Sequence, residues 1–325
     1  MEETLLRIEN LNTSFKTERG LMKAVDGVSF HVNKGEILAV VGESGCGKSV
    51  TVQSVLRLYD EKYQVRYSGE IHYKGRNLLG LSRKEMESIR GQEVSMIFQD
   101  ALSSLNPVFT VGEQIAESLR IHRKTDRKES QRRAAELLEL VGINDPLKRL
   151  EQYPFELSGG MRQRVMIAIA LACGPGLLIA DEPTTALDVT IQAQIMDLIV
   201  ELNKKLNMGV ILITHDLSVV AETCSRVVVM YLGQVVEEAQ VNRLFDKPLH
   251  PYTLGLIQSI PQVEGPRPRR LYMIKGMVPL LSQIPEGCRF APRCPRADDR
   301  CRREMPRLLP AGPDQKVRCF HANDL

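Results

Sequence analysis

Residues 42–49 read Gly42-Glu43-Ser44-Gly45-Cys46-Gly47-Lys48-Ser49, and this stretch matches the spacing G-x-x-x-x-G-K-[ST]. Residues 36–41 before it, apolar from Ile37 on, predict a short buried strand, and residues 48–58 after it predict a helix. A glycine-rich turn in this context predicts a loop (P-loop) whose backbone N–H groups wrap a phosphate chain. Lys48 is then expected to reach the β- and γ-phosphates, and Ser49 to bind Mg²⁺. The alternative is a plain glycine turn that joins a strand to a helix.

The composition is that of an ordinary globular chain. Of its 325 residues, 43% are hydrophobic and 26% charged, and 43 basic against 40 acidic residues give a formal charge of +3. This balance excludes a basic field over the whole protein. The longest apolar run, residues 165–173, is too short to cross a bilayer, which takes about 20 residues. The acidic start Met1-Glu2-Glu3 is unlike a secretory signal, so we expect a reducing, cytosolic environment without disulfides.

The order of the predicted elements indicates an α/β fold. The wholly apolar segments 177–180 and 210–213 are separated by a predicted helix from Val189, which is typical of parallel strands buried on both faces. Helical spacing of apolar residues predicts an inserted helical subdomain over about residues 100–170. Further predicted strands are 5–15, 25–32 and 69–73, in a partly antiparallel sheet, and 226–231 with 234–238, in a hairpin.

The length predicts roughly two domains. Residues 261–270, rich in proline and charge, are interpreted as a linker. We therefore expect one domain over residues 1–260 and a small tail over residues 261–325.

A P-loop needs an acid on the Mg²⁺ side, and the predicted strand 177–180 ends in Asp181-Glu182. Asp181 is expected to face the metal through water. Glu182 would lie next to the γ-phosphate and polarise an attacking water as a general base. Two acids at a strand end could also simply be solvated.

A second anion site is predicted at the start of another helix. Leu157-Ser158-Gly159-Gly160-Met161 precedes a long apolar helix, and a Ser-Gly-Gly helix start exposes N–H donors. A chain with one P-loop does not need two phosphate cradles unless the second serves the nucleotide of another subunit. The pattern therefore predicts a head-to-tail dimer.

In this order, the motifs resemble those of the ATP-binding subunits of ABC transporters, over residues 1 to about 260. The resemblance implies an ABC-type P-loop NTPase with a RecA-like core, an N-terminal antiparallel β subdomain and an inserted helical subdomain. It rests on residues 42–49, Gln99 in Ile97-Phe98-Gln99-Asp100, Leu157–Gly160, Asp181-Glu182-Pro183, Ala186-Leu187-Asp188, and His215 in Ile213-Thr214-His215-Asp216.

The resemblance also implies roles for single residues. Phe15 would stack on adenine, although a core position is an alternative for it; Asp188 would lie at the dimer interface. His215 would hold the γ-phosphate and Glu182 in register. The implied ATP-binding set is Phe15, Gly42, Ser44, Gly45, Cys46, Gly47, Lys48, Ser49, Val50, Ser158, Gly159, Gly160 and Asp188. The implied catalytic set is Glu182, His215, Gln99 and Lys48, and the Mg²⁺ set is Ser49, Gln99 and Asp181.

The tail carries four of the seven cysteines, Cys288, Cys294, Cys301 and Cys319, with the spacing C-x5-C-x6-C-x17-C. Four thiolates suit Zn²⁺ or an iron–sulfur cluster. Structural zinc modules usually include a tight C-x2-4-C pair, which this spacing lacks, so we expect a [4Fe–4S] cluster, with Zn²⁺ and reduced or incidentally paired cysteines as alternatives. His321 is a spare candidate ligand that we expect to be exposed.

The tail is also basic. Between Cys288 and Cys319, eight Arg and one Lys stand against four acids, a net charge of +5 that would compensate a cluster with four thiolates. A patch for nucleic acid or anionic lipid is the alternative explanation.

His250-Pro251-Tyr252-Thr253 followed by a Cys-bearing tail is similar to the oligopeptide and dipeptide importer branch of these ATPases. The resemblance implies an ATP-hydrolysing subunit, peripheral on the cytoplasmic face of the cell membrane, whose dimer closes on ATP and reopens after hydrolysis. Its expected partners are a second ATPase subunit, related or identical, and two transmembrane permease subunits that contact residues 99–110. An external solute-binding protein is expected to act indirectly. Nucleic acid is not expected as a partner. Alternatives are another small nutrient or metal chelate as cargo, a soluble ABC ATPase acting on nucleic acid or ribosomes, and a redox switch in the tail.

Overall fold

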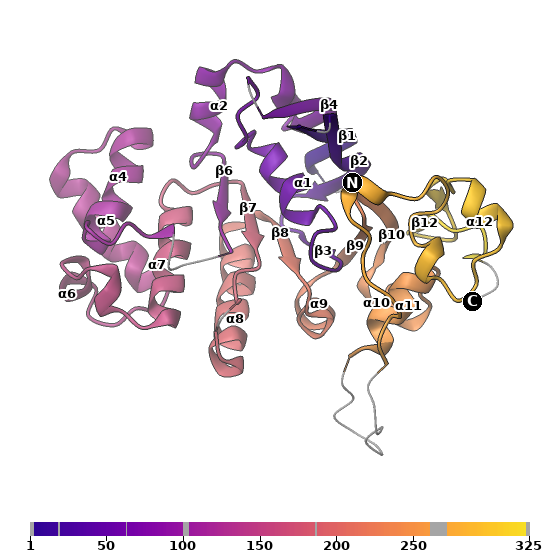
Figure 1. The fold of residues 1–325 in the computed structure, drawn as a ribbon. Coiled ribbons are helices and arrows are strands. Elements are labelled where there is room, and N and C mark those ends of the chain that lie inside the picture. The colour runs from indigo at the N-terminus through magenta and orange to yellow at the C-terminus, as the bar shows by residue number, and fades with distance from the viewer. Residues whose placement is uncertain are drawn as a thin grey trace. The chain divides into compact units, whose positions relative to one another are not determined.

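The computed structural model describes residues 3–18, 20–62, 64–99, 104–185, 187–260 and 272–322 (Figure 1). The chain divides into two compact units. Unit 1 consists of Met1–Leu5, Val32–Ile37 and Gly80–Ile213, and unit 2 of Leu6–His31, Leu38–Leu79 and Thr214–Leu325. The predicted linker at residues 261–270, Asp100 and Ala186 lie outside the described residues. The proposed domain boundary at residue 260 stays a prediction.

Unit 1 contains three parallel strands in the order β6-β7-β8: β6 (Val94–Ile97), β7 (Leu177–Asp181) and β8 (Gly209–Thr214). Every residue of β7 and β8 is buried, as their apolar sequences predicted. The carboxyl ends of these strands therefore lie at one edge of the sheet, and Asp181 lies there as the last residue of β7.

The helices of unit 1 include the predicted helical group. They are α2 (Arg83–Ile89), α4 (Val111–Arg123), α5 (Arg127–Leu140), α6 (Pro146–Leu150), α7 (Gly159–Leu171) and α8 (Val189–Leu206). Helices α4, α5, α6 and α7 contact one another and stand together in Figure 1. Helix α4 begins at a capping box, in which the Thr110 side chain accepts from the Glu113 N–H at 3.3 Å and Glu113 Oε2 accepts from the Thr110 N–H at 3.1 Å.

Unit 2 contains most of the predicted antiparallel sheet. Its order is β2-β1-β4-β5, formed by β1 (Thr4–Thr17), β2 (Gly20–Asn33), β4 (Val65–Tyr73) and β5 (Arg76–Asn77). Strands β1 and β4 pair antiparallel, with Ile8 opposite Ile71, both fully buried. Buried and exposed residues alternate only in part along β1, because the register shifts between Glu9 and Asn12.

A second group of strands in unit 2 follows the order β3-β9-β10-β12-β11. These are β3 (Ile37–Val41), β9 (Arg226–Tyr231), β10 (Gln234–Gln240), β12 (Gln315–Val317) and β11 (Leu309–Pro310). Strand β3 pairs parallel with β9, and β10 pairs antiparallel with both β9 and β12. The hairpin β9–β10 was predicted, whereas the return of the tail to pair with β10 was not.

The helices of unit 2 are α1 (Lys48–Val55), α9 (Leu217–Thr223), α10 (Val241–Asp246), α11 (Pro251–Gln258) and α12 (Asp299–Arg303). The prediction that the first helix extends to Leu58 is wrong, because it ends at Val55 with Leu56 as its C-cap. Arg57 adopts a φ of 47°, a left-handed conformation that stops the helix. Among the helices that the structure describes, none combines the length and apolar character that crossing a membrane takes.

A buried carboxylate joins the tail to β10. Glu237 is fully buried and accepts from the N–H groups of Leu249 at 2.7 Å and His250 at 2.9 Å. The Nε2 of Gln315, on β12, donates to the same carboxylate at 2.8 Å. Burial raises the pKa of Glu237, and these donors act in the opposite direction. Glu237 thus satisfies donors from two segments of unit 2, the chain before α11 and β12.

We expect Glu237→Ala to lower the free energy of unfolding by about 2–4 kcal/mol, because it leaves buried donors without an acceptor. Urea unfolding followed by circular dichroism under reducing conditions measures this change. The matched control is Glu304→Ala, an exposed carboxylate in the tail, with an expected change within about 0.5 kcal/mol. Equal stability of Glu237→Ala and the unmodified chain would contradict the role of this residue.

Candidate functional site

The predicted P-loop joins β3 to α1 in unit 2. Gly42, Gly45 and Gly47 have φ angles of 149°, 78° and 97°, which L side chains rarely adopt. A Cβ on Gly42 would lie 2.2 Å from the carbonyl oxygen of Met230, and one on Gly47 would lie 2.7 Å from that of Ala24. The close approach of neighbouring strands therefore requires glycine at these two positions.

Lys48 folds back onto the P-loop. Its Nζ donates to the carbonyl oxygens of Gly42 at 2.8 Å and Glu43 at 3.1 Å, and the residue is buried. Ser44 and Gly45 are exposed at the tip of the loop. The ammonium is thus held against the loop that is expected to receive phosphate.

Four other predicted ligands belong to unit 2, three in the P-loop and the start of α1 and one on β1. Ser49 and Val50 are half-buried in the first turn of α1. Cys46 is buried, and burial raises the pKa of its thiol, which makes it a neutral packing residue. Phe15 is half-buried, and its ring meets Tyr59 edge to face at a centroid distance of 4.9 Å. The adenine contact of Phe15 stays a prediction.

The acidic pair lies at the end of β7 in unit 1. Asp181 is the last residue of the strand and is buried. Glu182 follows with a φ of 47°, and its N–H donates to the carbonyl of Ile213 at 3.0 Å. Its Oε2 accepts from Gln99 Nε2 at 2.9 Å and from Thr185 Oγ1 at 3.0 Å. The structure therefore brings Gln99 and Glu182 together and adds Thr185, which sequence reasoning missed.

The Ser-Gly-Gly segment begins α7, as predicted. Ser158 is the N-cap residue, and its side chain accepts from the Met161 N–H at 3.4 Å. A Cβ on Gly160 would lie 2.8 Å from Ile191, so the start of α7 lies close to the start of α8. Asp188 caps α8 by accepting from the Ile191 N–H at 3.0 Å. The predicted second anion site and Asp188 are thus neighbours within unit 1.

His215 directly follows the last residue of β8, and its side chain is exposed. The P-loop belongs to unit 2, whereas Gln99, Glu182 and the Ser158 helix start belong to unit 1. The joint action of these groups on one nucleotide stays a prediction.

The His250-Pro251-Tyr252-Thr253 segment begins α11. His250 is the N-cap residue, and its Nδ1 accepts from the Tyr252 N–H at 3.1 Å. Burial lowers the pKa of His250 to about 3, so its ring stays neutral and able to accept. Tyr252 is fully buried, and its hydroxyl accepts from the Glu43 N–H of the P-loop at 2.7 Å. This motif therefore contacts the P-loop through Tyr252, and the sequence analysis did not predict this contact.

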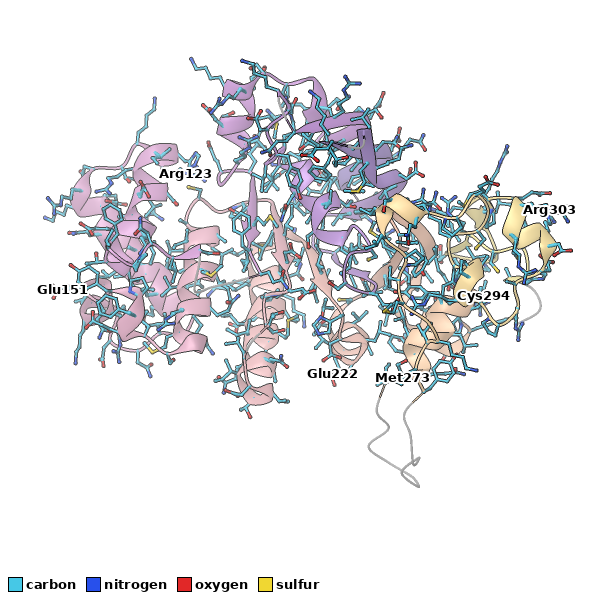
Figure 2. The ribbon with its side chains drawn as sticks, viewed as in Figure 1. Arg123, Glu151, Glu222, Met273, Cys294 and Arg303 are labelled. Carbon is cyan, nitrogen blue, oxygen red and sulfur yellow. The ribbon has the colours of Figure 1, made fainter. Side chains whose placement is uncertain are left out.

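The four tail cysteines line one small cavity in unit 2, with a volume of about 10 Å³. Figure 2 labels Cys294 in this tail. Burial raises the pKa of all four thiols, to about 11 for Cys319. Bare thiolates are thus disfavoured in the cavity, and a cation or cluster would have to compensate them.

Backbone contacts hold the thiols around this cavity. The Cys288 N–H donates to the carbonyl of Cys301 at 2.8 Å, and a Cβ on Gly287 would lie 2.4 Å from the same oxygen. The His321 N–H points to Cys319 Sγ at 3.4 Å. The fold therefore brings cysteines that are far apart in the sequence to one cavity.

His321 differs from its prediction. It is half-buried rather than exposed, it lines the thiol cavity, and its Nε2 lies 3.1 Å from Asp298 Oδ2. Among the described residues, one group of three ligand-type side chains has all its donor atoms within 4.8 Å of one another, namely Asp298, Cys301 and His321. The expectation of an exposed His321 is wrong because the end of the tail returns to the cavity after β12.

A glycine-lined loop between a buried strand and a helix, an acid pair ending a parallel strand and a capped Ser-Gly-Gly helix start define an ATP-binding cassette. The ABC transporter family profile matches residues 25–185, and that of the oligopeptide/dipeptide transporter C-terminal region matches residues 236–301. The chain belongs to the family of ABC transporter ATP-binding subunits, which confirms the resemblance seen in its sequence.

Relatives match over nearly the whole chain. The probable peptide ABC transporter ATP-binding protein y4tR of Sinorhizobium fredii is 53% identical over 323 residues, 99% of this chain and 96% of its own. The oligopeptide transport ATP-binding protein AppD of Bacillus subtilis is 52% identical, over 98% of this chain and 96% of its own. The dimeric structure of the ATP-binding cassette MJ0796, bound to ADP and phosphate, matches with a TM-score of 0.65 and 28% identity, over 73% of this chain and 99% of that one. These matches confirm the predicted cassette fold.

We expect Lys48→Ala to weaken ATP binding about 10- to 100-fold, because it removes a charge-assisted contact to phosphate. Equilibrium titration with a fluorescent ATP analogue measures the change. Lys204→Ala, an exposed lysine of α8, is the matched control and should bind as the unmodified chain does. Unchanged affinity in Lys48→Ala would show that the P-loop binds nucleotide without this ammonium.

Proposed function

We propose that this chain is the ATP-hydrolysing, energy-coupling subunit of a membrane importer for dipeptides or oligopeptides. The observation that carries the proposal is the union, in one chain, of an ABC cassette with the C-terminal region of oligopeptide/dipeptide transporters. Relatives that carry peptide transport in their names align from end to end with this chain. Another small nutrient or a metal chelate remains the alternative cargo.

Within the cassette, each residue has a physical task. The P-loop N–H groups and Lys48 hold the phosphates of ATP. Ser49, Asp181 and Gln99 would hold Mg²⁺, which when bound neutralises charge on the phosphates. Glu182 polarises the attacking water, and Gln99 and Thr185 fix the orientation of its carboxylate through Oε2.

A second cassette completes the site. The capped start of α7 presents N–H groups that would bind the γ-phosphate held by the partner subunit, and Asp188 would lie at this interface. ATP binding then closes the dimer and hydrolysis reopens it. A related but distinct ATPase subunit or a second copy of this chain can fill this place.

The membrane partners are two permease subunits, which place this chain on the cytoplasmic face as a peripheral protein. Val108 and Phe109, in the segment expected to contact the permease, are 72% and 49% exposed. Apolar side chains at this exposure favour a protein partner. The external solute-binding protein acts through the permease.

We expect Glu182→Gln to keep ATP binding while lowering turnover at least about 100-fold, because glutamine preserves the shape but cannot act as a base. Phosphate release measures turnover, and size-exclusion chromatography with ATP should show an accumulated dimer. Glu151→Gln, an exposed residue labelled in Figure 2, is the control. Persistent turnover in Glu182→Gln would assign the base to another group.

We also propose that the tail thiols hold a [4Fe–4S] cluster. In a closed zinc site with Zn–S bonds of about 2.3 Å, the thiolates lie about 3.8 Å apart. The described cysteines do not form a group of three with sulfurs within 4.8 Å, although all four line one cavity. Four thiols around one cavity, without the tight C-x2-4-C pair that is usual in structural zinc modules, support a cluster held by four thiolates. Asp298, Cys301 and His321 form the group that favours Zn²⁺ as the alternative.

Anaerobic purification followed by iron and acid-labile sulfide analysis should give about four of each per chain. Cys301→Ser should lose the visible absorbance of the cluster, because one ligand is missing. Cys224→Ser, a half-buried thiol outside the cavity lining, is the matched control and should keep it. Stoichiometric zinc without sulfide would replace the cluster by the zinc alternative.

A further inference from the structure

The loop between the first two tail cysteines extends from the thiol cavity to the P-loop. It reads Cys288-Arg289-Phe290-Ala291-Pro292-Arg293-Cys294, so two arginines and an aromatic ring lie between two thiols. All contacts described below lie within unit 2. We name residues 288–294 the thiol loop.

Arg293 binds the side chain of a P-loop residue. Its NH1 donates to Glu43 Oε2 at 2.6 Å and its NH2 donates to Glu43 Oε1 at 2.9 Å. The Arg293 side chain is only 4% exposed and that of Glu43 is 29% exposed. A bidentate pair at this burial fixes the orientation of the carboxylate as well as its charge.

The guanidinium of Arg293 is itself fixed. NH1 also donates to the Tyr231 hydroxyl at 3.3 Å, and Nε donates to the carbonyl of Lys275 at 3.1 Å. The Arg293 Cζ lies 5.8 Å from the centroid of the Tyr231 ring and 6.0 Å from that of Phe290. The thiol loop thus presents Arg293 to Glu43 in one orientation.

Phe290, the aromatic residue of the thiol loop, packs against the tyrosine that binds the backbone N–H of Glu43. Tyr252, whose hydroxyl accepts from the Glu43 N–H, has its ring centroid 5.4 Å from that of Phe290 and 4.8 Å from that of Tyr231. The side chain and the backbone of Glu43 are therefore both held by groups that pack on the thiol loop.

Arg289 makes a second connection to the P-loop. It donates to the carbonyl of Leu232, in the turn between β9 and β10. It also donates to Oδ2 of Asp26, on β2. The neighbouring Gly233 donates its N–H to the carbonyl of Cys46 at 2.8 Å and accepts from the Asp26 N–H at 2.8 Å. The thiol loop is therefore connected to the P-loop at two places, at Glu43 directly and at Cys46 through this turn.

We propose that Arg293 is a positioning residue of the ATP site, which neutralises and orients Glu43 and so makes ATP affinity depend on the conformation of the thiol loop. Glu43 places a carboxylate beside a loop that receives the negative phosphates of ATP. Without the guanidinium, this carboxylate repels the phosphates, and the first turn of the P-loop loses an anchor.

The proposal has a second part, which rests on the proposed occupant of the thiols. Cys288 and Cys294 are the ends of the thiol loop, so the group they hold sets the path of the chain between them. Loss of that group frees both ends, and Arg293 then no longer holds Glu43. The ATPase would thus bind its nucleotide tightly only when the thiol cavity is filled.

The test is a double-mutant cycle on the full chain, with a fluorescent ATP analogue for affinity and phosphate release for turnover. We expect Arg293→Ala to raise the dissociation constant and the KM for ATP about five- to twentyfold, with kcat at saturating ATP within about twofold. In the Glu43→Gln background, Arg293→Ala should change affinity less than about twofold, because no carboxylate is left to neutralise. Arg293→Lys should restore part of the affinity.

Arg303→Ala is the matched control, because Arg303 lies in the tail on α12, is exposed and contacts Asp299 rather than the P-loop (Figure 2). Equal ATP affinity of Arg293→Ala and Arg303→Ala would overturn the positioning role. Equal effects of Arg293→Ala with and without Glu43→Gln would overturn it as well, and would remain decisive if Arg293→Ala lowered the overall stability.

The second part is tested by measuring ATP affinity before and after oxidative or chelator removal of the metal, quantified by iron, sulfide and zinc analysis. We expect removal to weaken ATP binding in the unmodified chain and to change it less than about twofold in Arg293→Ala. Unchanged affinity after verified metal loss would overturn the coupling. A chain without iron or zinc would refute the proposed occupant, while the cycle between Arg293 and Glu43 would still decide the positioning role.

Discussion

The fold around the nucleotide site depends on the close packing of the P-loop against neighbouring strands. Gly42 lies so near the carbonyl of Met230 on β9, and Gly47 so near that of Ala24 on β2, that a methyl group at either place would clash. This packing fixes the curve of the loop and therefore the position of Lys48 at the start of α1. Parallel pairing of β3 with β9 holds the two sides of the contact together. Phosphate recognition thus follows from strand packing rather than from the loop alone.

In unit 1, the burial of strand β7 determines the positions of Asp181 and Glu182. Strand β7 is buried along its whole length, so Asp181 at its end is buried as well. Glu182 leaves the strand in a left-handed conformation, and two side chains hold its Oε2. A strained residue at the end of a buried strand is expected where a carboxylate must have one orientation. The geometry of Glu182 is consistent with the proposed role as a base.

The sequence predicted the elements whose pattern is local. Most strands of the cassette, the helices α4, α5 and α8, and the residues of the P-loop followed from periodicity, glycine spacing and strand ends, whereas β5 and β6 were not predicted. Strand β12 was missed because three residues carry no periodicity, and its pairing with β10 joins positions almost 80 residues apart. The Arg293–Glu43 pair was missed for a similar reason, since charged residues 250 positions apart give no signal in a single sequence. The order of the motifs predicted the cassette. The contacts between the tail and the cassette became visible only in the structure.

The described part of the tail belongs to unit 2. Strand β12 extends the sheet at β10, and the buried Glu237 carboxylate gathers donors from β12 and from the chain before α11. A segment that only covered the sheet would need apolar contacts alone. This one also buries two arginines at the cost of their desolvation: Arg293 binds Glu43 of the P-loop, and Arg289 binds Asp26 on β2. Buried charge of this kind contributes more to orientation than to stability. The thiol loop therefore contacts the P-loop through Arg293 and also lines the cavity of the four cysteines.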